Sequence, residues 1–269
     1  MIIAEFSHNH LGSKERLLQM VEVAAKAGVT FCKIQTHFSH DLSPEWKHEY
    51  ERVKGYELDF DTHGKFVDHC MKHGVIPMTS VYTDRYAQDL WAAGFRHIKV
   101  GSAQAKNEAL IKMYITLGFK VYLSTGGHDL NEITPIHPLA CVFHCVSKYP
   151  AKPTEANMLR LWQIKKRFPS APLGFSSHLD PLHPDTPGAL GTAAFLCEFV
   201  EVHFTILRRD ETKDGPVSLD SDQLTTLCEW DRLTEKQKRA LSPAIGFLDS
   251  PQSDEEKALI QRYSTRWNA

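Results

Sequence analysis

Short apolar runs alternate with longer amphipathic stretches along most of this chain of 269 residues. A short, continuous apolar run predicts a strand that is buried on both faces, which is typical of a parallel sheet covered by helices. The expected strands are residues 2–5, 31–35, 76–80, 97–100, 121–124, 140–145, 173–175 and 199–203.

The stretches between these runs carry apolar residues at helical spacing, and several of them end at a glycine. Residues 14–27 show this pattern clearly, because Leu17 and Val21 fall on one face and Gly28 follows as a stop signal. The other expected helices are 62–73, 84–93, 107–117, 154–168 and 187–197, with only a weak helix over 129–138. Residues 221–269 predict a last helix followed by a polar, helical tail.

Eight strand–helix units predict an α/β protein of the (β/α)8, or TIM barrel, class. The first and last expected strands start at residues 2 and 199, so the repeat is about 28 residues, close to the roughly 31 of a barrel of typical length. An open doubly wound sheet is the alternative, but no GxGxxG follows the first strand, which disfavours its commonest form. We expect a single domain, with the barrel core and active site in 1–220 and the last helix and tail in 221–269.

Composition excludes several classes of function. The chain has 31 Lys and Arg against 33 Asp and Glu, a net charge of −2, so it offers no basic field for nucleic acid. No apolar run is long enough to cross a bilayer, and the first residues do not resemble a signal peptide. The six cysteines include no CxxC, and Cys32, Cys141 and Cys197 lie in apolar runs, so these three are expected to be buried, reduced thiols. We therefore expect a cytoplasmic protein that acts on small molecules.

Polar side chains concentrate where the expected strands end, which is where a TIM barrel places its chemistry. Lys33 and Lys99, with neighbouring hydroxyl groups, could hold a phosphate and a carboxylate, although a structural ion pair is the alternative for each lysine. The residues 124–127 could form an anion-binding turn or simply end a strand. The other candidates at strand ends are Glu5, Gln35, Ser80, Ser102, Ser124, Ser147, Tyr149, Ser176 and Glu201.

Two of the fifteen histidines, His178 and His203, follow or end neighbouring strands. They could share one metal ion with a nearby carboxylate, and such nitrogen and oxygen ligands suit Mn, Zn or Fe. A hydrogen-bonded structural role is the alternative for each histidine alone. His144 and His10 are further candidates to line the site, whereas His8 is assigned no role.

The same stretches resemble, in order, the sialic acid synthase family, which comprises N-acetylneuraminate synthases and relatives that make other nonulosonic acids. The resemblance covers residues 2–220. The matching segments are Ile3-Ala4-Glu5, Asn9-His10, Lys33-Ile34-Gln35, Lys99-Val100-Gly101-Ser102, Leu123-Ser124-Thr125-Gly126, His144-Cys145-Val146-Ser147-Lys148-Tyr149-Pro150, Gly174-Phe175-Ser176-Ser177-His178, Glu201-Val202-His203-Phe204-Thr205, and Asp214 with Ser218-Leu219.

The resemblance implies a barrel enzyme that condenses phosphoenolpyruvate with an N-acylmannosamine-like aldose and releases phosphate. The residues it places around phosphoenolpyruvate are Lys33, Lys99, Ser102, Ser124, Ser176 and Tyr149. His178 and His203 match the family's metal-binding pair, for Mn, Mg, Co or Zn. Glu5 and Asp214 match acidic groups near the metal and the sugar, and Gln35 matches a sugar contact. Glu5, Asp214, His178 and His203 are thus the expected catalytic residues.

The chain departs from the family pattern at a few positions. Gln104 and Ser177 stand where the family carries acidic residues, while Ser80 and Ser147 keep a polar group. The family's C-terminal antifreeze-like domain is not found in these residues, so a homodimer is only an expectation. The alternatives are another metal-dependent barrel aldolase or isomerase acting on a phosphorylated sugar, or a sugar- or phosphate-binding barrel that has lost catalysis. Loops 36–57 and 207–218 are expected to select the sugar.

Overall fold

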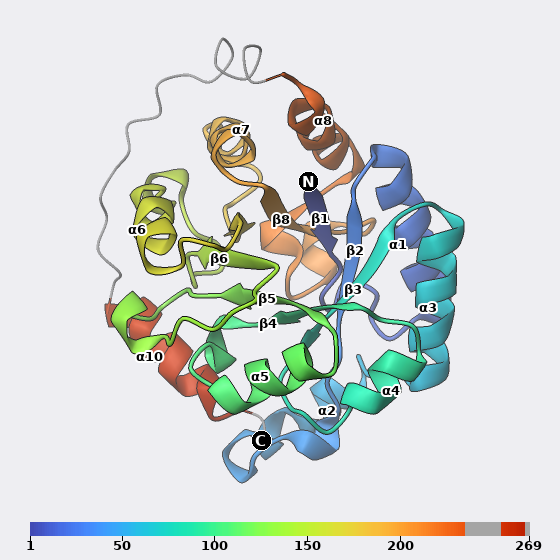
Figure 1. The fold of residues 1–269 in the computed structure, drawn as a ribbon. Coiled ribbons are helices and arrows are strands. Elements are labelled where there is room, and N and C mark those ends of the chain that lie inside the picture. Colours follow the sequence, from blue (N-terminus) through green and yellow to red (C-terminus); the bar gives the residue numbers. More distant parts are fainter. Residues whose placement is uncertain (235–253, 267–269) are drawn as a thin grey trace.

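The computed structural model describes residues 1–234 and 254–266, and its centre is a closed barrel of eight parallel strands (Figure 1). Each strand pairs with the next in sequence, and β8 pairs with β1, so the barrel has no free edge. The (β/α)8 prediction is confirmed. The strands are β1 (Ile2–Glu5), β2 (Phe31–Gln35), β3 (Ile76–Val81), β4 (His97–Val100), β5 (Lys120–Ser124), β6 (Cys141–Cys145), β7 (Leu173–Ser177) and β8 (Phe199–Phe204), with a short β9 (Ser218–Leu219) beside β8.

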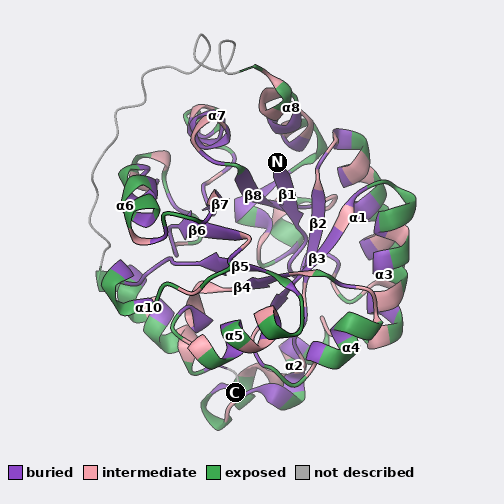
Figure 2. Cartoon of the chain, in the orientation of Figure 1, coloured by how far each residue is buried: buried purple, intermediate pink, exposed green. Residues whose placement is uncertain are grey.

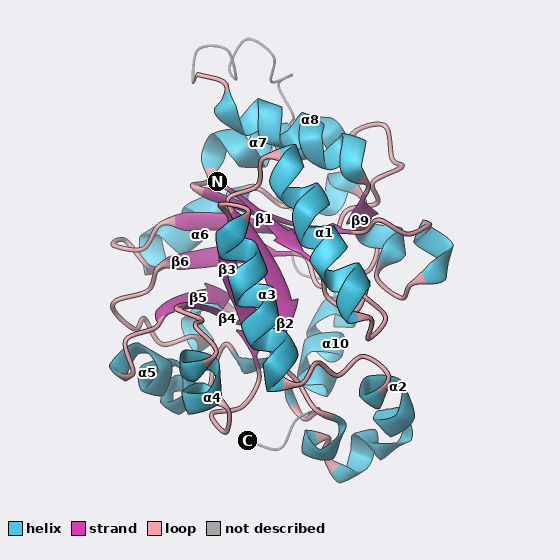
Figure 3. Cartoon of the chain, turned by 90° about the vertical axis from the view of Figure 1, so that its right-hand side faces the viewer, coloured by secondary structure: helices cyan, strands magenta, loops and turns pink. Residues whose placement is uncertain are grey.

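Helices surround the barrel, with buried residues on the faces toward the strands and exposed residues outside (Figure 2). They are α1 (Lys14–Ala27), α2 (Tyr50–Lys54), α3 (Phe60–Lys72), α4 (Ala87–Ala92), α5 (Glu108–Thr116), α6 (Leu159–Arg167), α7 (Thr186–Leu196), α8 (Ser221–Arg232) and α10 (Asp254–Ser264). Seen from the side, α2 and α10 lie near the end toward which the strands run (Figure 3). Within the described ranges, no helix has the length and apolar character needed to span a membrane.

Two connections differ from the sequence prediction. The weak helix expected over 129–138 is wrong, because only a single 3₁₀ turn forms there, at Leu130–Glu132. Pro135 and Pro138 explain the difference, since each restricts the preceding residue to extended backbone. Helix α6 starts later than expected, because Asn157 adopts a positive φ of 46°, a conformation that a helix does not continue through. The tail is helical over α10, whereas 235–253 and 267–269 lie outside the described residues.

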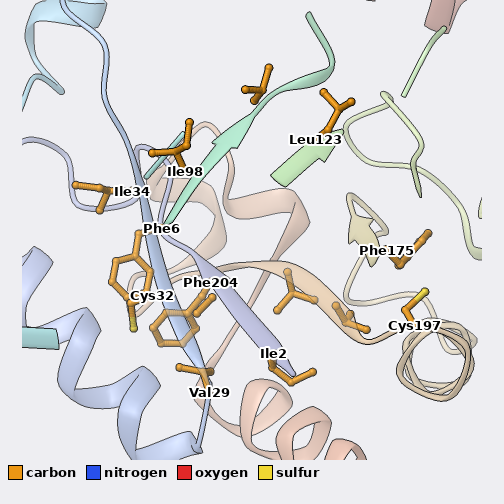
Figure 4. Packing of buried hydrophobic residues seen from close by; sticks show 14 of the residues in the cluster. Ile2, Phe6, Val29, Cys32, Ile34, Ile98, Leu123, Phe175, Cys197 and Phe204 are labelled. Atoms are coloured by element: carbon orange, nitrogen blue, oxygen red, sulfur yellow. The ribbon is translucent and has the colours of Figure 1, made fainter. Parts of the chain in front are cut away.

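Strand alternation decides which side chains enter the barrel. Successive residues of a strand point to opposite faces, so Phe31, Lys33 and Gln35 of β2 point inward. Cys32 and Ile34 instead join the apolar layer between the strands and the surrounding helices (Figure 4). The same alternation in every strand separates the side chains inside the barrel from the apolar layer under the helices.

The interior of the barrel is divided along its axis. Its lower half, where the strands begin, is filled by an apolar cluster. The cluster consists of Ile3, Phe31, Met78, Tyr122, Cys141, Phe143 and Phe199. Because this cluster closes the lower half, the polar residues farther along the same strands face only the opposite, open end. All six cysteines are buried and unpaired, including Cys32, Cys141 and Cys197, for which burial was predicted.

Gly174 of β7 tests the packing of the lower half. A Cβ atom at this position would lie 2.5 Å from the Phe143 ring and 2.8 Å from Cys141 Sγ. We expect Gly174→Ala to lower the free energy of unfolding by about 1–3 kcal/mol through overpacking, as measured by urea denaturation. Gly64→Ala is the matched control. Gly64 lies within α3 with nothing within 4 Å of an added Cβ, so alanine there should stabilise by roughly 0.5–1 kcal/mol. Equal effects of the two changes would contradict this description of the core.

Candidate active site

A cleft of about 760 Å³ opens at the end of the barrel toward which the strands run. Every strand of the barrel contributes at least one side chain to it, because the polar residues near each strand end point inward. All thirteen site residues predicted from the sequence line this cleft. They are Glu5, Lys33, Gln35, Ser80, Lys99, Ser102, Ser124, Ser147, Tyr149, Ser176, His178, His203 and Asp214.

Two lysines and two glutamates form a buried ion-pair network at the floor of the cleft. Lys33 Nζ contacts Glu5 Oε2 directly and lies 3.7 Å from Glu201 Oε2. Lys99 Nζ lies 2.6 Å from Glu201 Oε1. All four side chains are buried, where an uncompensated charge would be very unfavourable. The structural ion pairs considered from the sequence are therefore present, with equal numbers of positive and negative groups.

Hydroxyl groups surround this network and fix the ammonium positions. Lys33 donates to Ser80 Oγ at 2.7 Å, and Lys99 donates to Ser176 Oγ at 3.2 Å. Burial alone would raise the pKa of Glu201, but the two adjacent ammonium groups lower it to about 2. Burial lowers the pKa of Lys33, and Glu201 acts in the opposite direction. The glutamate therefore stays ionised at neutral pH.

A turn after β5 closes one side of the cleft. The backbone N–H of Gly126 donates to Ser102 Oγ at 3.0 Å. Gly127 has a positive φ of 70°, and a Cβ there would overlap Ile260 of α10. Glycine is thus required by both the backbone conformation and the close approach of the helix. The structure fits the strand-ending turn considered from the sequence.

The histidine pair stands between the ends of β7 and β8. His178 Nδ1 donates to the Val146 carbonyl oxygen at 2.7 Å, which leaves Nε2 to accept from the Tyr149 hydroxyl at 2.9 Å. The His178 and His203 ring centroids are 5.5 Å apart. Burial lowers the pKa of both imidazoles, that of His178 to about 3. Both are therefore neutral, which is the form of histidine that binds metals.

A polar network lines the side of the cleft near β1 and β2. Ser7 Oγ donates to Asp214 Oδ2 at 2.5 Å, and Gln35 donates to Ser7 Oγ at 3.1 Å. Tyr82 in turn donates to Gln35 Oε1 at 3.1 Å. His8 Nδ1 lies 3.7 Å from the same Asp214 oxygen. These groups offer several hydrogen-bonding positions, which suits a polyhydroxylated ligand.

Several cleft residues were not predicted from the sequence. His8, which was assigned no role, lines the cleft, and so do Ser7, Tyr82 and Lys213. Ser7 and His8 come two and three residues after the end of β1, so their position after a strand was an available signal. The sequence also gave no sign that α10 would line the cleft. The lining residues of α10 and just after it are Glu255, Ala258, Leu259, Ile260, Arg262, Tyr263 and Arg266.

Four other positions lie away from the cleft. His144, predicted as a lining candidate, faces outward, where its Nε2 contacts the Ala156 carbonyl oxygen at 2.8 Å. The other lining candidate, His10, is buried, and its Nδ1 accepts from the Gly12 N–H. Ser177 alternates with the inward Ser176, and Gln104 bonds to Asn107. Gln104 and Ser177, the two positions where this chain lacks an acidic residue of the family, therefore do not line the cleft.

A different group of metal-ligand side chains lies on the outer surface. Glu22 of α1, His69 of α3 and His73 just after α3 offer ligand atoms within 4.8 Å of one another, and they are the one such set of three in the described part of the chain. None of them lines the cleft. Within the cleft, His178 and His203 offer two neutral imidazoles, and a metal ion there would need further ligands from water, substrate or another side chain.

Comparison with known proteins finds one matching family and several curated relatives that are synthases of sialic-type acids by name. The model of the NeuB family matches residues 20–241, more than half of the chain. The N,N'-diacetyllegionaminic acid synthase of Campylobacter jejuni is 25% identical over 260 residues, which are 88% of this chain and 76% of that protein. The N-acetylneuraminate-9-phosphate synthase of Drosophila melanogaster is 28% identical over 249 residues, which are 84% of this chain and 65% of that protein.

Solved structures agree on the fold. The crystal structure of the N-acetylneuraminic acid synthetase from Leptospira borgpetersenii, in complex with citrate, superposes with a TM-score of 0.78. The match covers 97% of this chain and 90% of that chain at 24% sequence identity. This similarity supports the barrel architecture.

The shared carboxylate of the ion-pair network gives a prediction about stability. Glu201→Gln leaves buried ammonium groups short of a counter-ion, so we expect the free energy of unfolding at pH 7 to fall by about 3–5 kcal/mol. The exposed Glu229→Gln on α8 is the control and should change it by less than about 0.5 kcal/mol. Urea denaturation measures both.

The same variant should alter the acid dependence of stability. The folded-state pKa of Glu201 lies below its unfolded value, so the unfolded chain takes up this proton first as the pH falls. The stabilisation is present above the unfolded pKa and is lost between about pH 5 and pH 2. Glu201→Gln should lack this part of the acid-induced loss. An unchanged stability at pH 7 together with an unchanged acid slope would contradict the network.

Proposed function

Because this chain belongs to the NeuB family, we propose that it condenses phosphoenolpyruvate with an aldose to form a sialic-type 2-keto-3-deoxy acid. The observation that carries the proposal is the convergence of two lysines, a set of serines, a histidine pair and acidic groups in one cleft. The names of the relatives agree with such a carbon–carbon bond-forming synthase. One of these names includes a phosphate and the other does not, so the family leaves the class of aldose open.

Lys33 and Lys99 bind the phosphate and carboxylate of phosphoenolpyruvate in this proposal. Each ammonium already lies beside a carboxylate and a serine hydroxyl, at Ser80 and Ser176. An incoming anion accepts hydrogen bonds from the same ammonium groups, which Glu5, Glu201 and the serines already hold in place. Ser102, Ser124, Ser147 and Tyr149 extend the polar surface around it. These fixed donors stabilise the phosphate as it leaves.

The two histidines fit a divalent metal ion. His203 Nδ1 is buried and has no hydrogen-bond partner in the described chain, and the His178 tautomer leaves Nε2 as an acceptor. His178 and His203 would hold the ion, which is Mn, Mg, Co or Zn. When bound, such an ion polarises the carbonyl oxygen of the aldehyde.

The reaction then needs a new carbon–carbon bond, a water and a proton acceptor. C3 of phosphoenolpyruvate attacks the aldehyde carbon, water adds at C2, and phosphate leaves with cleavage of the C2–O bond. Glu5 is held on both oxygens, by the Ser7 N–H at 2.6 Å and by Lys33. Asp214 uses Oδ2 for Ser7 and His8. We therefore assign proton transfer to Asp214, and to Glu5 the positioning of Lys33.

The test of this proposal is formation of product from phosphoenolpyruvate and aldoses, with a divalent metal present. Mass spectrometry should find a product whose mass equals phosphoenolpyruvate plus aldose plus water minus phosphate. The panel should include N-acetylmannosamine and its 6-phosphate. Loss of phosphoenolpyruvate without such a product would contradict a synthase.

Substitution of the histidines locates the metal dependence. His178→Ala should lower turnover by about 100-fold or more, because it removes a metal ligand. His73→Ala is the matched control, since it removes a ligand of the surface group on α1 and α3 and should leave turnover unchanged. Chelation should stop the wild type, and added metal should restore it. Full activity of His178→Ala in chelator would overturn the assignment.

A further inference from the structure

The surface group of Glu22, His69 and His73 lies outside the barrel, where α1 and α3 run side by side (Figure 3). Glu22 belongs to α1, His69 lies in the last turn of α3, and His73 is the residue that ends this helix. The chain enters β3 at Ile76, three residues after His73. The surface group therefore lies near the end of the barrel where the strands begin, whereas the cleft lies at the opposite end.

The three side chains are already close to one another. His69 Nε2 lies 3.0 Å from Glu22 Oε1. The His69 and His73 ring centroids are 4.6 Å apart, because residues four apart lie on the same face of a helix. Ligand atoms around a tetrahedral zinc ion are about 3.3 Å apart when each bond is about 2.0–2.1 Å long. The ligand atoms of the surface group lie within 4.8 Å of one another, so each pair needs to close by about 1.5 Å at most.

The core holds the backbone under these ligands, whereas two of the side chains are free to rotate. Glu22 follows Val21 and His69 precedes Cys70, and both of these neighbours are fully buried in the apolar layer under the helices. Each helix also begins at a residue whose side chain caps its first turn. Glu22 and His73 are exposed. A small rotation of either side chain therefore brings its ligand atom onto an ion while the helices stay in place.

The donor atoms of the surface group favour zinc over magnesium and calcium. Two imidazole nitrogens and one carboxylate oxygen are an established ligand set for zinc, and two histidines four apart on one helix face recur in zinc sites. Magnesium and calcium instead prefer sites built from oxygen atoms. Three ligands leave one position of a tetrahedral ion open, which a water molecule can occupy.

We propose that Glu22, His69 and His73 form a zinc site separate from the cleft, and that the bound ion links α1 to α3. The ligands come from two segments that are far apart in the sequence and meet only when the helices pack on the barrel. Zinc therefore binds the folded chain in preference to the unfolded chain and stabilises it. The inference does not depend on the proposed function, because no residue of the surface group lines the cleft.

Zinc binding is measured on the chain carrying His178→Ala and His203→Ala, so that the histidine pair of the cleft cannot hold an ion. Equilibrium dialysis against zinc, followed by metal analysis, should find one zinc ion per chain. Adding His73→Ala should weaken this binding by about 100-fold or more, because a ligand is lost. Adding Glu22→Gln instead should weaken it by about 10-fold, since the amide keeps the shape of the side chain but lacks its charge.

His48→Ala is the matched control. His48 is exposed like His73, but its ring stacks on Trp46 and it does not belong to the surface group. This change should leave zinc binding as it was. Urea denaturation of the same variants gives a second measurement. At a zinc concentration about 100 times the dissociation constant, the ratio of folded to unfolded chains should rise about 100-fold, and His73→Ala should remove this rise.

Three results would overturn the zinc site. Absence of bound zinc would leave only the hydrogen bond between His69 and Glu22 across the two helices. Zinc binding that is unchanged in His73→Ala would show that the ion binds elsewhere. Zinc binding without a rise in the folded fraction would show that the unfolded chain binds zinc equally well, so that the ion does not stabilise the helix pair. One zinc ion per chain that is lost in His73→Ala and stabilises the fold supports the site.

Discussion

Pairing of β8 with β1 is the constraint on which the rest of the molecule depends. Once the sheet closes, half of the residues of every strand must point into an enclosed space. Near the strand starts these residues are large and apolar, as Phe31 and Phe199 show. Near the strand ends they are charged or hydroxylated, as Lys33 and Glu201 show. The cleft therefore arises from closure of the barrel combined with the direction of the strands.

Closure also explains how four charged groups are accommodated inside the barrel. Each lysine or glutamate alone would be strongly destabilising in this environment. The registers of β1, β2, β4 and β8 bring them together in alternating sign, so each charge has an opposite partner. The ammonium groups are therefore desolvated and held in place before any ligand binds. The ion-pair network stabilises the folded barrel and also holds the two lysines that, in the proposed function, bind phosphoenolpyruvate.

The sequence predicted much of the candidate site, because position in a TIM barrel is nearly determined by position along a strand. An inward-facing residue near the end of a strand, such as Lys99 or His203, enters the cleft once the barrel has closed. The same reasoning failed for His144, which ends a strand but occupies an outward position. The helix predicted over 129–138 from apolar spacing was also wrong, because two prolines prevent a helix there. Whether a strand residue points into or out of the barrel depends on its exact position along the strand. The sequence pattern alone leaves that position uncertain by one residue, which is enough to reverse the side on which a side chain lies.

The sequence by itself determined the barrel, the strand ends that carry chemistry and most of the thirteen predicted cleft residues, because these depend on local periodicity and chain direction, whereas Asp214 came from the family resemblance. Only the tertiary structure decided that Lys33 and Lys99 share buried carboxylates, that His8 enters the site and that α10 lies over the barrel end. It alone brought Arg266, from just after α10, to the same carboxylate, Glu49, that binds Arg52. Contacts between such distant segments depend on the packing of loops and a terminal helix, and no local pattern in the chain encodes them.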